Sequence, residues 1–219
     1  KHHTHFLAAF STRVAPDPAA AAPEPVDPAA PGTYGDPYAD GVTFQECFRA
    51  QGEGVDFCAF HAGGTKFFVY DDGRTPEFVF SVMRVMDPGT PLAVQGDLEA
   101  IYDSTADVVL RDVSVRSWSD GDAKLNLMQG HWYSVDDPNA QFTMLGAERT
   151  NSYDGAVTSL EFVSVQDWCE SFDGAGPYLY AREAETAEYS CYAIDHIDQL
   201  SMTLMYLPGG NFLEYRKLD

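Results

Sequence analysis

The chain has 219 residues, of which 34 are Asp or Glu and 13 are Lys or Arg, so its formal net charge is −21 at pH 7. Binding to nucleic-acid phosphates or to an anionic lipid surface requires clustered Lys and Arg. Because none cluster here, we exclude both classes of partner. The charge does not imply disorder, since 45% of the residues are apolar and 13% are aromatic.

The acidic residues are spread along the whole chain. Residues 1–40 hold 2 basic and 5 acidic side chains, residues 41–126 hold 7 and 14, and residues 127–219 hold 4 and 15. We interpret this distribution as a solvated, self-repelling surface. The alternative is an acidic face that meets a basic partner or binds cations.

Residues 1–14 form a short apolar segment around Phe6–Phe10 that is too short to span a bilayer. No stretch of about twenty apolar residues occurs, so we predict no transmembrane helix within these 219 residues. His2, His3 and His5 are candidate ligands for Cu(II) or Ni(II) if the amine of Lys1 is free. The alternative, which we favour, is an incidental histidine-rich flank that binds no metal.

Residues 15–40 are predicted to be a linker, because they hold seven of the thirteen prolines of the chain. Proline-rich chain prefers the extended polyproline II conformation and acts as a semi-rigid spacer. A spacer between a short apolar segment and folded domains is typical of a tethered envelope protein. We therefore expect an anchor upstream of Lys1, and contact between residues 1–40 and a protein partner, such as a membrane complex.

Residues 41–126 are predicted to form a small β domain. Strands are expected at residues 56–61, 66–71, 76–86, 91–101 and 107–117. A short helix is expected at residues 43–51, because Thr43 and Glu46 have the spacing of a capping box. Gly96 within a strand indicates a bulge or bend, and five short strands with this feature resemble an OB-like barrel. We assign the aromatic side chains of this region to its core: Phe67, Phe68, Tyr70, Phe78 and Phe80.

Residues 127–219 are predicted to form an up-and-down meander of eight strands that closes into a barrel. The strands are expected at residues 130–135, 141–145, 149–153, 157–165, 177–182, 188–194, 200–207 and 211–217. Turn dipeptides such as Asp154-Gly155 separate them, and the connections are short with one exception.

This second region resembles the calycin group, the lipocalin-like barrels. Those families have a Gly-x-Trp on the first strand and an Arg or Lys on the last strand that packs over the Trp. Here the first strand reads Gly130-His131-Trp132, and the last includes Arg216. The resemblance implies structural roles for both residues: Trp132 plugs the closed end, and Arg216 covers its ring by a cation–π contact. With about 90 residues, the barrel is short enough to be filled by its own side chains.

The four cysteines fall into two local pairs, one in each predicted domain. The spacings are not those of zinc ligands, so we predict two disulfides, Cys47–Cys58 and Cys169–Cys191. Disulfides indicate an oxidising compartment, periplasmic or extracellular. The alternative is four reduced, buried thiols in a cytosolic protein.

No catalytic motif is recognisable. The chain has no Gly-x-Ser-x-Gly and no P-loop, and the internal histidines (His61, His131 and His196) lie far apart in sequence. We therefore predict no catalytic residue and no cofactor. The favoured function is a non-enzymatic interaction or accessory subunit of a cell-envelope complex. The alternatives are a carrier of a small apolar ligand in the second barrel and an enzyme of unknown type.

Overall fold

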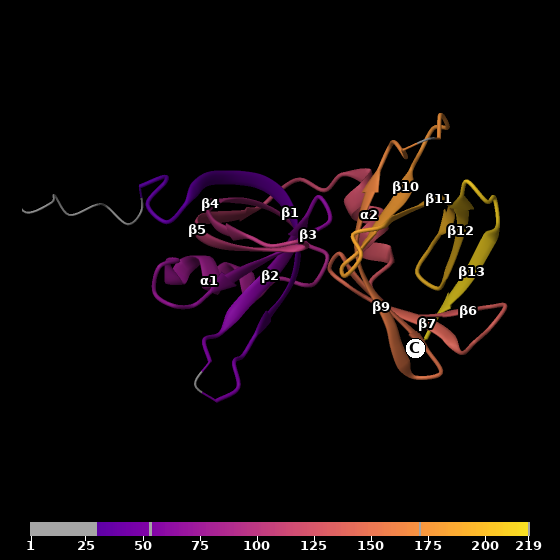
Figure 1. Cartoon of the computed structure of the whole chain (residues 1–219), viewed down its shortest axis with the longest axis horizontal. Coiled ribbons are helices and arrows are strands. Elements are labelled where there is room, and N and C mark those ends of the chain that lie inside the picture. The colour runs from indigo at the N-terminus through magenta and orange to yellow at the C-terminus, as the bar shows by residue number, and fades with distance from the viewer. Residues whose placement is uncertain (1–29, 53, 171, 219) are drawn as a thin grey trace, which may run out of the picture.

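The computed structural model describes residues 30–218 except residues 53 and 171 (Figure 1). The predicted apolar segment at 1–14, the candidate metal ligands His2, His3 and His5, and most of the predicted linker lie outside the described residues. The described chain forms two closed β-barrels, as predicted for an all-β protein with two domains. Figure 1 shows them side by side, with α2 (Asp120–Leu127) at the junction.

The first barrel has five strands and one helix in the order β1 (Asp36–Phe48), β2 (Phe57–Ala62), β3 (Thr65–Tyr70), α1 (Glu77–Met83), β4 (Pro91–Ile101) and β5 (Thr105–Val115). Around the barrel the strand order is β1-β2-β3-β5-β4, with β3 and β5 parallel. This five-stranded closed arrangement confirms the predicted OB-like barrel. Gly96 lies at a register shift between β4 and β5, as predicted. The position requires glycine, because a Cβ there would lie 2.3 Å from the carbonyl oxygen of Val109.

Two elements of the first barrel differ from the prediction. Most of the segment expected to be a helix at 43–51 belongs to β1, which ends at Phe48. Val42 and Phe44 alternate into the core, and the strand pairs with both β2 and β4. That strand begins at Asp36, five residues before the predicted start of the domain at 41. The segment expected to be a strand at 76–86 instead contains helix α1, in which Val79, Phe80 and Met83 share one buried face.

The second barrel is an eight-stranded antiparallel meander, as predicted. Each strand pairs with its neighbours in sequence, and β13 closes the barrel onto β6. The strands are β6 (Gly130–Ser134), β7 (Ala140–Leu145), β8 (Glu148–Tyr153), β9 (Ala156–Gln166), β10 (Tyr178–Glu183), β11 (Tyr189–Ile197), β12 (Ser201–Leu207) and β13 (Phe212–Lys217). The alternation predicted for β12 is confirmed, since Met202 and Leu204 are buried in the core.

One end of the second barrel is closed by the segment that joins the two barrels. Helix α2 begins at a capping box formed by Ser119 and Asp122, and Met128 follows its last turn. Trp132 is fully buried, and its Nε1 donates a hydrogen bond to the carbonyl oxygen of Met128 over 2.7 Å. The cation over its ring is Lys217, whose Nζ lies 4.9 Å from the centroid. The prediction of Arg216 was wrong by one residue, because strand alternation turns that side chain outward.

Both predicted disulfides are present, Cys47–Cys58 and Cys169–Cys191. The first links the paired strands β1 and β2. The second fastens the loop between β9 and β10 to β11, on the outside of the second barrel. Together they fit an extracellular or periplasmic protein. No helix in the described ranges, 30–52, 54–170 and 172–218, has the length and apolarity needed to cross a membrane.

Candidate functional site

The two barrels are joined by a polar contact that we call the seam, formed by Gln45, His61, Lys66, Glu148 and Phe162. Glu148, at the start of β8, lies at its centre. Its carboxylate accepts hydrogen bonds from Lys66 Nζ at 2.7 Å and from Gln45 Nε2 at 3.1 Å. Both donors belong to the first barrel, so this single side chain ties the two barrels together.

Two aromatic rings hold the lysine of the seam in place. Lys66 Nζ lies 5.7 Å from the centroid of Phe48 and 5.6 Å from that of Phe68, within cation–π range. Burial alone would raise the pKa of Glu148, but the hydrogen bond and the positive charge of Lys66 hold it below its usual range. The ammonium group of Lys66 is therefore enclosed by the Glu148 carboxylate and the rings of Phe48 and Phe68.

The aromatic side chains of the first barrel divide between the core and the surface. Phe67 and Phe80 are buried, as predicted. Phe68 and Tyr70 are only half-buried and lie on the outer face of β3, because Phe67 and Val69, which alternate with them, point inward. Phe78 is 51% exposed. The assignment of these last three side chains to the core was wrong.

His61 is buried in the seam without a hydrogen bond. It is 3% exposed, and its ring lies 5.1 Å from that of Phe162. Its Nε2 is 3.8 Å from Glu148 Oε2, too far for a hydrogen bond, and neither ring nitrogen has a partner among the described residues. Burial lowers the pKa of His61, so the ring is neutral in the folded protein near pH 7.

Close backbone approach and an arginine complete the contact between the barrels. Gly146, in the turn between β7 and β8, has φ of +62°, and a Cβ there would lie 2.6 Å from the carbonyl oxygen of Phe44. Only glycine allows this approach. Arg182 on β10 donates to the carbonyl oxygens of Gly64 at 3.0 Å and Asp103 at 2.8 Å in the first barrel.

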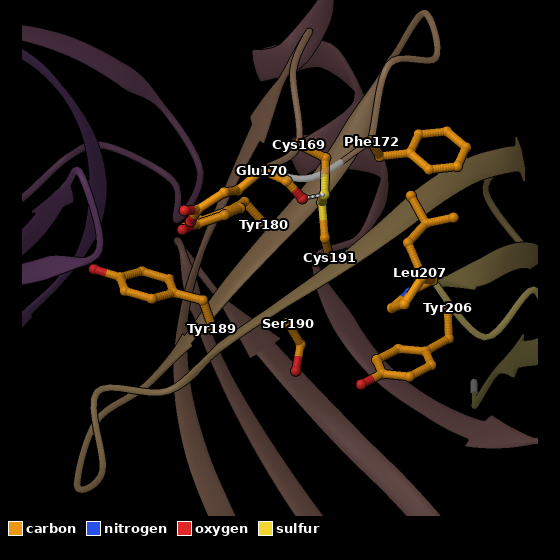
Figure 2. Close-up of a pocket in the computed structure, with 10 residues that line it drawn as sticks. Cys169, Glu170, Phe172, Tyr180, Tyr189, Ser190, Cys191, Tyr206 and Leu207 are labelled. Carbon is orange, nitrogen blue, oxygen red and sulfur yellow. Dashed lines mark hydrogen bonds between the residues drawn. A yellow bond between two sulfur atoms is a disulfide. The ribbon is translucent and has the colours of Figure 1, made fainter.

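A second site lies on the outside of the second barrel, and we call it the tyrosine pocket. Leu179 and Ala181 of β10 point into the barrel core, so Tyr178 and Tyr180, which alternate with them along the strand, face outward. There they meet the loop held by the Cys169–Cys191 disulfide. Figure 2 shows the disulfide at the centre of the pocket, with Glu170, Tyr180 and Tyr189 on one side and Tyr206 and Leu207 on the other. The cavity has a volume of about 340 Å³.

The pocket combines aromatic rings with a carboxylate. The ring centroids of Tyr180 and Tyr189 lie 4.8 Å apart, and that of Trp168 lies 6.1 Å from Tyr180. The pKa of Tyr180 is raised by burial and by the neighbouring Tyr189 and Glu170. The Glu170 carboxylate makes no ion pair with any side chain in the described part of the chain.

Ser201, His196 and Asp198 lie together in the second barrel but do not form a catalytic triad. Asp198 and Ser201 lie 3.1 Å and 3.2 Å from the same atom, His196 Nε2. A triad needs the base to hold the carboxylate with one ring nitrogen and the nucleophile with the other. Asp198 also accepts the backbone N–H groups of Leu200 and Ser201, as in an ordinary turn.

The interior of the second barrel contains a buried ion pair. Arg149 is 6% exposed and pairs with Glu161, and its guanidinium lies 5.6 Å from the ring of Phe142 and 5.3 Å from that of Tyr192. A cavity of about 420 Å³ at the mouth is lined by Phe142, Asn151 and Tyr215, among others.

The comparisons with known proteins assign no family to this geometry. No family model matches the chain, and no curated protein and no solved structure matches it. Of the residues singled out from the sequence, Trp132 and the four cysteines have the predicted structural positions, and His61 lies in the seam. Glu148, which the sequence did not single out, lies beside it. The sequence analysis missed the tyrosine pocket. Its signal was the density of aromatic and acidic residues in the segment 167–190.

Proposed function

We propose that this protein is a non-enzymatic interaction subunit of the cell envelope that binds a protein partner through the tyrosine pocket. The observation that carries the proposal is the pocket itself: an exposed, concave, tyrosine-rich surface held by a disulfide. Tyr and Trp are enriched where proteins bind one another, because a rigid ring supplies a large contact area at low entropic cost. Trp168 and Tyr189, which are 60% and 52% exposed, supply such rings.

Two further features support the proposed setting. The disulfides support export to the periplasm or the cell surface, where such bonds persist. The proline-rich sequence at 15–40 supports a tethered protein, with residues 1–40 as a spacer that also contacts the membrane complex. His196 contacts Asp198 and Ser201 through the same nitrogen, and Glu148 is paired with Lys66, so we assign a catalytic role to neither residue.

Site-specific photo-crosslinking in the native host tests the proposal. A photoreactive phenylalanine analogue replaces Tyr189 in one strain and Tyr153 in another, because these tyrosines are 52% and 51% exposed and lie in different parts of the barrel. We expect a discrete crosslinked protein from position 189 and none from position 153. Equal crosslinking from both positions, or none from position 189, would contradict the proposal.

A further inference from the structure

Two sites in this molecule show how it holds a buried cation. In the seam, Lys66 lies between the rings of Phe48 and Phe68 and pairs with Glu148. Inside the second barrel, Arg149 lies over the rings of Phe142 and Tyr192 and pairs with Glu161. Both sites have the same three components: a pair of aromatic rings, one carboxylate and one basic side chain.

The tyrosine pocket has the pair of rings and the carboxylate, but no basic side chain of the described residues pairs with that carboxylate. Tyr180 and Tyr189 supply the pair of rings, and Glu170 supplies the carboxylate (Figure 2). The guanidinium of Arg182 lies 5.8 Å from the Tyr189 ring. Its hydrogen bonds go to the backbone of the first barrel, at Gly64 and Asp103, so it does not neutralise Glu170.

The surroundings of the pocket favour a cation from outside the chain. The segment 167–190, which contributes most of the lining, carries six acidic residues and one basic residue, Arg182. The net charge of −21 attracts positive groups toward the molecule. A pocket of about 340 Å³ has room for the end of one long side chain.

We propose that the tyrosine pocket binds the cationic side chain, Arg or Lys, of a basic partner protein, with its charged group against the faces of Tyr180 and Tyr189 and beside the Glu170 carboxylate. The inference rests on the proposed function and names the chemistry of the partner. The partner supplies the basic side chain that Lys66 supplies in the seam. A neutral side chain of the same shape gains neither the cation–π contact nor the ion pair, and binds more weakly.

A matched pair of small probes tests this chemistry on the full chain. N-acetyl-arginine amide and N-acetyl-citrulline amide have the same shape, but only the first is charged. Calorimetric titration is expected to give a dissociation constant on the order of millimolar for the arginine probe, about fivefold tighter than for the citrulline probe. Equal affinities, or no binding of the arginine probe, would overturn the inference.

Variants locate the binding in the pocket. Glu170→Gln preserves shape and removes the charge, and Tyr189→Leu removes a ring. Each is expected to lower the affinity for the arginine probe by about threefold or more. Asp136→Asn and Tyr153→Leu are the controls, because both residues are exposed and lie outside the pocket; neither is expected to change the affinity. Equal weakening by Glu170→Gln and Asp136→Asn would assign the binding to the general negative charge and overturn the inference.

The outcomes separate this inference from the proposed function. If position 189 crosslinks to a partner but the arginine probe does not bind, the pocket is an interaction site for a different chemistry and the inference fails alone. If the probe binds but no partner crosslinks, the cation site stands and the proposed function fails. Choline is the third probe: an affinity for choline clearly above that for the arginine probe would assign the pocket to a small quaternary ammonium and contradict a protein side chain.

Discussion

The seam and the tyrosine pocket use the same kinds of side chains in opposite circumstances. In the seam, Glu148 is shielded and paired with Lys66, and the arrangement holds two barrels together. In the tyrosine pocket, Glu170 is exposed and has no ion-pair partner among the described residues. The difference teaches that one combination of rings and a carboxylate stabilises the fold when its cation is internal. It remains available for binding when the cation must come from elsewhere.

The seam and the pocket also differ in whether their carboxylates are paired with a basic side chain of the chain itself. Basic residues are scarce, and three of them pair with carboxylates that are largely shielded: Arg111, Arg116 and Arg149. The surplus of carboxylates is left on the surface, including the rim of the pocket. A basic partner would therefore meet little competition from the protein's own cations at that rim.

The largest expected effect comes from breaking the seam at its carboxylate. Glu148→Ala removes the acceptor for Lys66 and Gln45 and leaves both side chains shielded without a partner. We expect the free energy of unfolding to fall by about 3 kcal/mol, as when one member of a buried ion pair is removed. Chemical denaturation measures this change. The exposed Glu214→Ala serves as control and should change stability by less than about 0.5 kcal/mol. Similar losses for both variants would show that the seam contributes nothing special.

The next effect comes from the backbone contact at Gly146. Gly146 and Gly155 both have positive φ, +62° and +79°, so alanine is strained at either position. Only at Gly146 would the added Cβ meet the backbone of the first barrel; at Gly155 nothing lies within 4 Å. Gly146→Ala is therefore expected to cost about 2 kcal/mol more than Gly155→Ala in denaturation experiments. Equal costs would show that the barrels do not approach this closely.

A smaller effect is expected from pH, through His61. Its pKa is lowered below 6.5 in the folded protein, so the unfolded chain binds more protons as the pH falls below that value. Stability should therefore decrease from pH 7 toward pH 5, by roughly 1 kcal/mol from this group. Lys66 opposes protonation of the ring and Glu148 favours it, but burial dominates.

His61→Phe keeps an aromatic ring beside Phe162 and removes the titration. The difference between the unfolding free energies at pH 7 and pH 5 should shrink in this variant and stay unchanged in the exposed His131→Phe. A wild-type pH dependence retained in His61→Phe would show that other groups cause it.

The smallest effect on stability is expected in the tyrosine pocket. Tyr189→Leu and Glu170→Gln alter exposed side chains, so each should change the unfolding free energy by less than about 0.5 kcal/mol. Each should also lower the affinity for the arginine probe. The two sites would then separate cleanly: seam variants lose stability, and pocket variants lose binding. A large loss of stability in Glu170→Gln would show that the pocket is part of the structural framework.

The sequence predicted best what depends on local signals. The eight strands of the second barrel follow from apolar runs interrupted by turns such as Asp154-Gly155, and the disulfides follow from the pairing of nearby cysteines. It failed where distant pairing overrides local preference. The capping-box spacing of Thr43 and Glu46 suggested a helix, but β2 and β4 draw these residues into a strand.

The seam lay beyond sequence reasoning, because Lys66 and Glu148 are 82 residues apart and their contact depends on how two barrels meet. Whether Arg216 or Lys217 lies over Trp132 depends on which of the two side chains points into the barrel. A shift of one residue along the strand exchanges the two faces. The tyrosine pocket could have been suspected from the aromatic and acidic residues at 167–190, but its concave form requires the loop to fold back through Cys169.

The most direct test of the central claim is to locate the arginine probe by NMR. Titration of isotope-labelled full-length protein with N-acetyl-arginine amide, monitored by chemical shifts of backbone amides and tyrosine rings, reports every site that the cation contacts. The account predicts saturable shifts concentrated at Glu170, Tyr180 and Tyr189, with the seam around Lys66 and Glu148 unchanged. Small, non-saturating shifts spread over the acidic surface, with no preference for the pocket, would contradict it.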